Sequence, residues 1–354
     1  MKLKGITLLL ASLSLFNCKS QTTALYVGTY TDGESEGIYR LEFNAATGEL
    51  SNKTLAARVE NPSFISFSPN KKFIYAVGEG SSSAVTAFKL RKDGLLELIN
   101  QVSSNGKGPC HVAINAAGNK AVVSNYGGGT VSIYTINENG SLNEASQVFD
   151  HNIENEKSHV HSAQFDQNNL FVADLGRNAL YHYVLEDSIY KIKSTAITEM
   201  KGNPGPRHFT MTENKKQIYV INEYANSITA LKKTEHGFES FSEYTTLAPS
   251  FNGESFCADI HLSQDERFLY GSNRGENSIV VFKRNLENGT LENIQNSSVH
   301  GDWPRNFTLD PTGTFMLVAN QRSHNISVFK VDQKTGKLSF LNTTHLPSPV
   351  CLLF

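Results

Sequence analysis

The sequence predicts an all-β protein in which seven four-stranded sheets close into a ring, and three observations support this prediction. First, short runs of Tyr, Phe, Val and Ile alternate with clusters of Gly, Asn and Ser, as expected for strands joined by tight turns. Second, one motif recurs at a nearly constant spacing along the chain. Third, each end of the chain carries part of one further copy.

Six copies of the motif are complete, and each reads as an apolar strand, a polar turn, a second strand that usually ends in Asn or Asp, and a third strand. They occupy residues 61–90, 108–136, 159–185, 205–231, 256–283 and 303–330. One position of the first strand falls in a common register at Pro62, Pro109, Val160, Pro206, Cys257, Pro304 and Pro349. The intervals are 47, 51, 46, 51, 47 and 45 residues. A period of this size with four strands per unit is typical of a β-propeller.

The seventh unit is split between the two ends of the chain. Residues 348–354 match only the first strand of the motif, whereas residues 24–51 match the second to fourth strands. Pairing these segments would close the ring and hide the sheet edges that otherwise invite aggregation. We therefore expect one propeller domain over residues 23–354. Hairpin turns such as Asp93-Gly94 and Asn139-Gly140 would precede the fourth strands.

The first residues have the layout of an export signal. Two lysines precede an apolar run over residues 6–16, which is too short to cross a bilayer, and Cys18 follows. The "LFNC" stretch resembles a bacterial lipoprotein box, with Asn17 where a small residue is usual. We expect residues 1–18 to act as a signal peptide and Cys18 to be lipidated, which would place the protein in the periplasm or cell envelope. Without a functional signal it would stay in the cytoplasm.

Composition excludes some classes of function. The formal net charge is −2 and charged residues make up 19% of the chain, so the sequence lacks the basic footprint of nucleic-acid binding. Cys110, Cys257 and Cys351 show no metal-ligand spacing, and we expect them to be small buried residues, with a disulfide left open. We expect a monomer that acts on a small molecule.

The repeat aligns residues that should stand in rings around the central channel, because the first strand of each propeller blade lines it. One ring is formed by Ser63, Cys110, His161, Arg207, Ala258, Arg305 and Val350. The next is formed by Phe64, His111, Ser162, His208, Asp259, Asn306 and Cys351. Three histidines, two arginines and an aspartate are unusual for strand starts that serve packing alone.

A further column, at the end of the second strands, places Glu223 beside Arg274 in the next blade. His161, Arg207, Glu223 and Arg274 should therefore converge on one sector of the channel mouth. Arginines bind carboxylate or phosphate, a carboxylate between them stays ionised, and histidine transfers protons near neutral pH. A polar network that merely fills the channel remains an alternative. Neither a Gly-x-Ser-x-Gly elbow nor a His-Glu-x-x-His motif occurs.

The motifs "YVGTYT", "GPCHVAI", "HVHSAQFD", "GPRHFTM", "NEYANSI", "SNRGENSI" and "WPRNFTLDPTG" together resemble the seven-bladed propeller lactonases, whose relatives include bacterial 6-phosphogluconolactonase and carboxy-cis,cis-muconate cyclase. The resemblance covers the whole chain after the signal. It implies hydrolysis of a sugar δ-lactone without a metal or organic cofactor. It also implies catalytic roles for His161, Arg207, Glu223 and Arg274. The substrate-binding rim would then contain His111, His159, His208 and Arg305.

Within that resemblance, the two arginines would stabilise the oxyanion, Glu223 would orient or deprotonate water, and His161 would protonate the departing ring oxygen. Two other functions remain open. One is the reverse type of reaction, in which a muconate-like acid is closed to a lactone. The other is a non-enzymatic surface propeller that binds a glycan or a protein. Because phosphorylated sugars are scarce outside the cell, an exported member would act on an unphosphorylated lactone.

Overall fold

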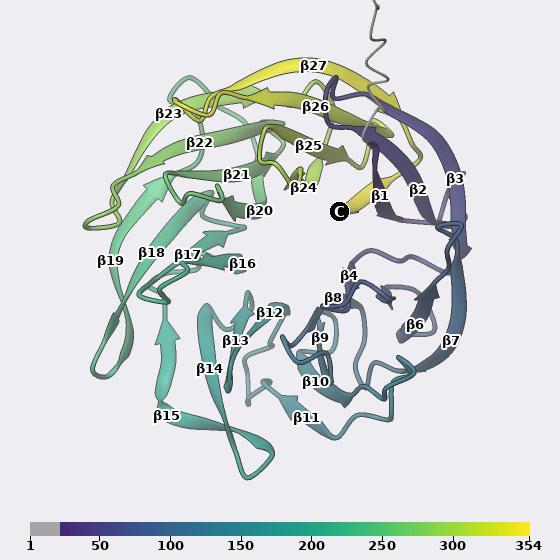
Figure 1. Cartoon of the computed structure of the whole chain (residues 1–354). Coiled ribbons are helices and arrows are strands. Elements are labelled where there is room, and N and C mark those ends of the chain that lie inside the picture. The colour runs from purple at the N-terminus through teal and green to yellow at the C-terminus, as the bar shows by residue number, and fades with distance from the viewer. Residues whose placement is uncertain (1–21) are drawn as a thin grey trace, which may run out of the picture.

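The computed structural model describes residues 22–354, except the side chains of residues 193–196, and confirms the seven-bladed propeller. Seven antiparallel sheets of four strands each surround a central axis (Figure 1). The expected signal peptide and Cys18 lie outside the described residues. No helix that could cross a bilayer occurs within residues 22–354.

Each blade contributes one strand to each of four concentric layers. The inner strands are β4 (Ile65–Phe67), β8 (Pro109–Ile114), β12 (Val160–Asp166), β16 (Pro206–Met211), β20 (Phe256–Leu262), β24 (Pro304–Leu309) and β28 (Pro349–Leu353). The second strands are β5 (Phe73–Gly78), β9 (Lys120–Asn125), β13 (Asn169–Asp174), β17 (Gln217–Asn222), β21 (Phe268–Arg274), β25 (Phe315–Asn320) and β1 (Thr22–Thr29).

The two outer layers complete the blades. The third strands are β6 (Ala84–Leu90), β10 (Thr130–Thr135), β14 (Ala179–Glu186), β18 (Ser227–Thr234), β22 (Ser278–Arg284), β26 (Asn325–Val331) and β2 (Gly37–Asn44). The outermost strands are β7 (Leu96–Ser103), β11 (Gln147–Asp150), β15 (Ile189–Glu199), β19 (Gly237–Thr245), β23 (Leu291–Ser298), β27 (Leu338–His345) and β3 (Leu50–Arg58).

The split blade closes the ring as the sequence predicted. Strand β28 pairs antiparallel with β1, with Tyr26 opposite Leu353 and Val27 opposite Leu352, and the sheet continues through β2 and β3. In Figure 1 the yellow C-terminal strand lies beside the purple N-terminal strands, and the C-terminus ends near the axis. The C-terminal segment therefore supplies the inner strand that the N-terminal part of this blade lacks.

The core is divided among the interfaces between neighbouring blades. Leu25 and Val27 of β1, for example, share one apolar cluster with Leu317 and Ala319 of β25. The second strands are almost wholly buried because both of their faces pack against neighbouring sheets. This packing fixes the angular position of every inner strand, and with it the positions of the channel residues.

Tyrosines of the second strands join neighbouring blades at the predicted hairpins. Tyr75 donates a hydrogen bond to the carbonyl of Gly140 (3.1 Å), and Tyr219 does the same to Gly289 (2.7 Å). Gly140 has a φ of 86°, and a Cβ there would lie 2.4 Å from the Phe73 ring, so glycine is required both by the turn and by the packing. The expected positive-φ hairpins are thus confirmed.

Removing residues 349–354 should abolish cooperative folding, because β28 supplies the buried side chains of Val350, Cys351 and Leu352 as well as its pairing with β1. Burial of each such side chain is worth about 1.5–3 kcal/mol, against a typical total stability of about 5–15 kcal/mol. Thermal unfolding followed by circular dichroism tests this. A chain lacking only Phe354 is the control and should melt cooperatively. A cooperative transition at the wild-type temperature in the longer truncation would contradict the expectation.

Candidate active site

A β-bulge in five of the seven inner strands turns one residue out of the sheet. In β16, Pro206 pairs with Asn222 and His208 pairs with Ile221, so Arg207 has no partner in β17. The same one-residue skip occurs at Cys110, His161 and Arg305, and at Val350 in β28. Bulges re-aim side chains beside functional sites. These residues are members of the first ring that the repeat predicted.

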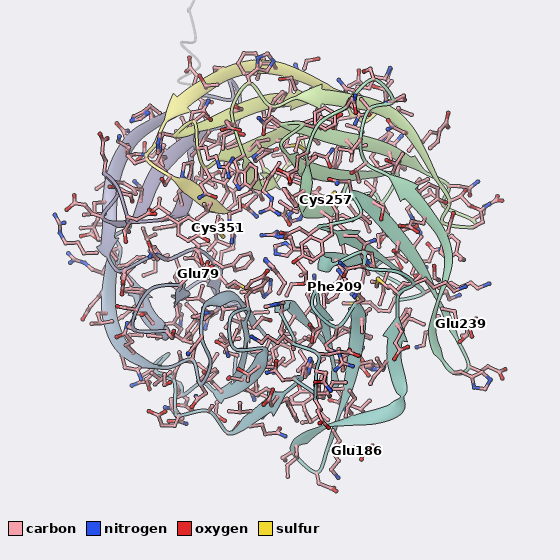
Figure 2. All side chains as sticks on the ribbon, turned by 180° about the vertical axis from the view of Figure 1, so that it is seen from behind. Glu79, Glu186, Phe209, Glu239, Cys257 and Cys351 are labelled. Atoms are coloured by element: carbon pink, nitrogen blue, oxygen red, sulfur yellow. The ribbon has the colours of Figure 1, made fainter. Side chains whose placement is uncertain are left out.

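The skipped residues meet around a small cavity. Its walls are formed by Ser63, Phe64, Cys110, His161, Arg207, His208, Arg305, Asn306 and Val350. Six of these residues belong to the first ring and three to the second. Figure 2, seen from behind, shows the labelled Glu79, Phe209, Cys257 and Cys351 close to the axis, whereas Glu186 and Glu239 lie at the periphery. The alignment of the repeats therefore located the residues that line the channel.

Glu223 is held between two arginines. Its Oε2 lies 3.0 Å from Arg207 Nε and 2.9 Å from Arg274 Nη2. Arg207 also donates to the carbonyl of Ala258, and Arg274 Nη2 donates to the carbonyl of Cys257 (2.8 Å). These backbone contacts fix both guanidinium groups relative to β20. The predicted convergence of Arg207, Glu223 and Arg274 is present in the structure.

A second ion-paired group, which the sequence did not reveal, faces the same channel. Arg305 Nη2 lies 3.8 Å from Glu79 Oε2, and Tyr30 donates a hydrogen bond to the same oxygen (2.8 Å). The Arg305 guanidinium lies 5.4 Å from the centroid of the Tyr30 ring. Glu79 occupies the same register as Glu223, so its column was the one signal that could have identified it.

Burial and mutual attraction set the charges of these groups. Burial raises the pKa of Glu223, but Arg274, Arg207 and Arg305 outweigh this effect and hold it below its ordinary value. Burial and the neighbouring Arg274 and Arg305 lower the pKa of Arg207 to about 10. At neutral pH both arginines remain cations and Glu223 remains an anion whose Oε2 is engaged by both of them.

The four candidate histidines have different positions. His161 and His208 line the cavity, with ring centroids 5.1 Å apart. His111 is buried behind them, packed between Phe64 (4.2 Å) and His208 (5.7 Å). His159 stacks on Tyr126 and its Nδ1 lies 3.0 Å from the Tyr126 carbonyl oxygen. The structure thus places His161 and His208 at the cavity, whereas His111 and His159 support their neighbours.

The cavity histidines are neutral. Burial, followed by repulsion from Arg207, lowers the pKa of His161 well below its ordinary value and that of His208 to about 4. Burial and repulsion from His208 do the same to His111. A neutral imidazole can accept a proton or donate a hydrogen bond, but it holds no extra proton to release. The role of proton donor that the resemblance implied for His161 is not favoured in the free protein.

The remaining predicted features are less directly chemical. Cys110, Cys257 and Cys351 are free and buried, as expected. Within residues 22–354 no group of three or more His, Cys, Asp or Glu residues is arranged to hold a metal ion. The site therefore offers fixed cations for an oxyanion and neutral imidazoles for proton transfer, which together suit attack of water on a carbonyl.

Stability should fall in mild acid because of the three buried histidines. A histidine with a lowered pKa in the folded protein binds a proton less readily than the same residue in the unfolded chain. Its full contribution to the free energy of unfolding is therefore present above about pH 6.5 and is lost as the pH falls below that value. His111→Phe keeps the stack on Phe64 and removes one such group. We expect urea unfolding of this variant to show a pH slope shallower by up to about 1.4 kcal/mol per pH unit below pH 6.

His261 provides a check of opposite sign. Burial opposes protonation of His261, but Asp259 raises its pKa overall. The contribution of His261 to the free energy of unfolding is therefore present below about pH 6.5 and is lost as the pH rises through the pKa of the folded protein. His261→Gln should therefore remove a decline in stability that the wild type shows as the pH rises just above 6.5, and it should leave the slope below pH 6 unchanged. Identical pH profiles of stability in wild type, His111→Phe and His261→Gln would contradict these charge states.

Comparison with known proteins agrees with the fold. A family model described as "Lactonase, 7-bladed beta-propeller" matches residues 24–354. The protein named 6-phosphogluconolactonase from Bacillus subtilis is 33% identical over 341 residues, which cover 93% of this chain and 97% of that protein. A crystal structure of a putative 6-phosphogluconolactonase from Bacteroides uniformis superposes with a TM-score of 0.87 at 31% identity, covering 94% of this chain and 99% of that one.

A third relative carries a different name. The structure described as a periplasmic gluconolactonase of Pseudomonas aeruginosa superposes with a TM-score of 0.89 at 27% identity, and it covers 94% of this chain and 99% of that chain. The likenesses to all three proteins extend over nearly the full length of both partners. With a seven-bladed ring, its bulged inner strands and a family match from residue 24 to the last residue, this chain belongs to the seven-bladed β-propeller lactonase family.

Proposed function

We propose that this protein hydrolyses a sugar δ-lactone and that the preferred substrate is unphosphorylated. The observation that carries the proposal is the nearly balanced set of charges around the channel. Arg207, Arg274 and Arg305 supply three positive charges, and Glu223 and Glu79 supply two negative ones. The Asp259 carboxylate is taken up by its own contacts with His208 and with His261, whose pKa it raises. A neutral lactone that develops one negative charge in the transition state matches the remaining single positive charge.

A phosphorylated lactone would fit this charge set less well. A sugar phosphate brings a charge of about −1.5 to −2 near neutral pH, and it is usually bound by arginines or lysines that are free to pair with it. Here each channel arginine already faces a glutamate. The histidines at the cavity add no positive charge, because burial and Arg207 lower the pKa of His161 and of His208.

The residues divide the reaction among themselves in this proposal. Arg207 and Arg274 bind the carbonyl oxygen and stabilise the oxyanion that forms when water attacks. Glu223, whose Oε2 is paired with both arginines, aligns the two guanidinium groups and orients the water. His161 binds the ring oxygen from within the cavity. Arg305, fixed by Glu79 and Tyr30, contacts the hydroxyl groups of the sugar.

The relatives support this proposal in complementary ways. The Bacillus subtilis protein is named for a phosphorylated lactone, whereas the Pseudomonas aeruginosa structure is described as a gluconolactonase of the periplasm. Together with the signal-like first residues, the second name supports an exported protein that meets unphosphorylated sugars.

We propose that the protein is held at the cell envelope through a lipid on Cys18. Metabolic labelling with an alkyne fatty acid should mark the wild-type protein but not Cys18→Ser, and labelling of both would refute the anchor.

The central test is a panel of lactones assayed with the purified protein, in which acid release is followed after subtraction of spontaneous hydrolysis. We expect a higher kcat/KM for glucono-δ-lactone than for 6-phosphoglucono-δ-lactone. Glu223→Gln should reduce kcat on both substrates by about 10²-fold or more, because the two arginines lose the charge that aligns them.

The outcomes of this assay test the substrate preference, the role of Arg207 and the lactonase activity separately. Activity restricted to the phosphorylated lactone would refute the substrate preference and leave the lactonase activity in place. If Arg207→Ala lost activity only toward that substrate, Arg207 would belong to phosphate binding instead of to the reacting carbonyl. Failure to hydrolyse any lactone in the panel would refute the proposed function.

A further inference from the structure

Apart from Arg207 Nε, which lies 3.0 Å from Glu223 Oε2, three buried polar atoms of residues that line the channel cavity have no hydrogen-bond partner within residues 22–354. They are Ser63 Oγ, His161 Nδ1 and His208 Nε2. The cavity leaves about 10 Å³ for the centre of a water molecule, which is room for about one water. A buried water needs two to four polar partners, and these three atoms supply them. The cavity therefore has the size and the lining of a site for a single water.

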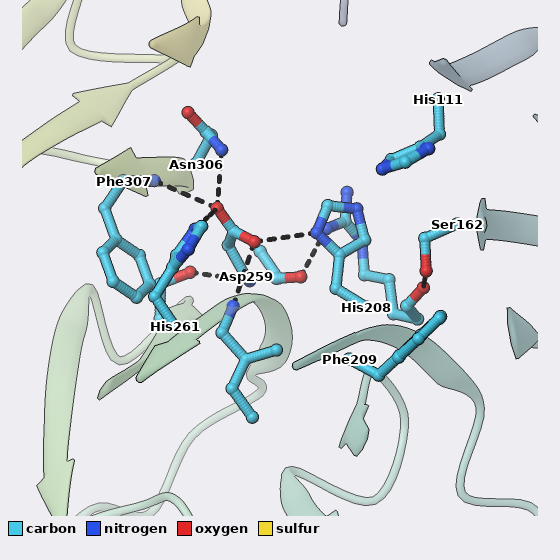
Figure 3. A network of polar contacts seen from close by, with 12 residues as sticks. His111, Ser162, His208, Phe209, Asp259, His261, Asn306 and Phe307 are labelled. Carbon is cyan, nitrogen blue, oxygen red and sulfur yellow. Dashed lines mark hydrogen bonds and ion pairs between the residues drawn. The ribbon is translucent and has the colours of Figure 1, made fainter. Parts of the chain in front are cut away.

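His208 is held in one orientation by a buried carboxylate. Its Nδ1 lies 2.8 Å from Asp259 Oδ1, and both side chains are at least nine-tenths buried (Figure 3). Burial raises the pKa of Asp259, but His261 and the hydrogen bonds from His208 and His261 hold it well below its ordinary value, so Asp259 is ionised and can only accept. The neutral His208 ring must therefore carry its proton on Nδ1, which leaves a lone pair on Nε2.

Asp259 is itself fixed from several sides. Its Oδ2 accepts hydrogen bonds from Asn306 Nδ2, from the Phe307 backbone N–H and from His261 Nε2 (3.0 Å), and its Oδ1 accepts the Ile260 backbone N–H (3.0 Å). Figure 3 shows these donors converging on the carboxylate from β20 and β24. A carboxylate with so many donors has no freedom to turn, so the His208 ring has a single orientation.

The chain contains a second buried histidine–aspartate pair, in which both ring nitrogens of the histidine have partners, and it serves as a comparison for a purely structural pair. His151 Nδ1 lies 3.0 Å from Asp174 Oδ2, and its Nε2 is bonded to the hydroxyl of Tyr183. Both ring nitrogens of His151 are thus occupied, and the ring lies among β14 side chains away from the channel. The second nitrogen of His208, by contrast, has no partner, and His208 is one of the residues that line the cavity.

We propose that this cavity holds the water that attacks the lactone, and that His208, oriented by Asp259, is the base that deprotonates it. This inference rests on the proposed lactonase function and adds to it a catalytic residue and a positioning residue. The lactone lies at the mouth of the channel, because the cavity has room for no more than water. Its carbonyl meets the water from the side of Arg207, which lines the cavity and also pairs with Glu223.

The proton that leaves the water passes through His208 to the leaving ring oxygen, so the step needs no other proton donor or acceptor. His208 Nε2 takes one proton from the water while the water oxygen bonds to the carbonyl carbon, which gives a tetrahedral oxyanion and an imidazolium. Asp259 stabilises that imidazolium through Nδ1. Collapse of the intermediate breaks the bond between the carbonyl carbon and the ring oxygen, and the imidazolium returns the proton to that oxygen. The hydroxy acid is released, and its carboxyl group then ionises in solvent.

The test compares two matched substitutions in the full-length protein. His208→Gln and His151→Gln each replace a buried histidine by an amide that can still donate to the same aspartate. We expect His208→Gln to reduce kcat on glucono-δ-lactone by about 10²- to 10⁴-fold with little change in KM, and His151→Gln to retain wild-type kcat. Added imidazole should restore turnover to His208→Ala in a concentration-dependent way, which a purely structural defect would not allow.

A second readout needs no turnover. Nitrogen-15 NMR of the imidazole rings, assigned with His208→Gln, should show a neutral His208 protonated at Nδ1, and Asp259→Asn should change that tautomer. Protonation at Nε2 in the wild type would overturn the inference, even if no lactone were hydrolysed. Equal kcat in wild type and His208→Gln, or equal losses in both glutamine variants, would also overturn it, yet lactone hydrolysis by the wild type would still uphold the proposed function.

Discussion

The chemistry of this channel depends on one extra residue in each bulged inner strand. A regular strand in a propeller blade points its side chains alternately at the two neighbouring blades, and neither direction reaches the axis. The bulges at His161, Arg207 and Arg305 provide a third direction, so side chains from blades far apart in the sequence meet in one cavity. His161, Arg207 and Arg305 therefore sit on paired strands, and Glu223 and Glu79 lie one residue past the ends of β17 and β5, which keeps these groups in fixed positions without substrate.

The buried charges are tolerable only as a set. Arg207 is 2% exposed, and burial of an unpaired guanidinium would cost several kcal/mol. Glu223 compensates both Arg207 and Arg274, and backbone carbonyls of β20 take up further donors of the two arginines. Burial, with repulsion from Arg207, lowers the pKa of His161 and of His208 and keeps both neutral. One electrostatic arrangement thus supplies an oxyanion site and a proton acceptor side by side.

The regular part of this molecule could be predicted from the sequence, because it repeats. The period, the split blade, and the meeting of Arg207 with Glu223 and Arg274 all follow from aligned copies of one motif. Tyr30 was missed although Thr29 pairs with Pro349 as Asn222 pairs with Pro206, which puts Tyr30 in the register of Glu79 and Glu223. Nor does the alignment show that His159 packs on Tyr126, or that the Nε2 atom of His208 is left without a partner, because side-chain rotamers decide both.

Closure of the ring and orientation of the proposed base are physically connected. The backbone N–H of Leu352 in β28 donates to Asn306 Oδ1 (2.7 Å), Asn306 Nδ2 donates to Asp259, and Asp259 accepts from His208. In the same strand, Val350 forms part of the cavity wall. The last segment of the chain therefore both completes the fold and completes the hydrogen bonds that fix His208. An open ring would lack a wall of the cavity and one support of its carboxylate, so this site can exist only in the closed propeller.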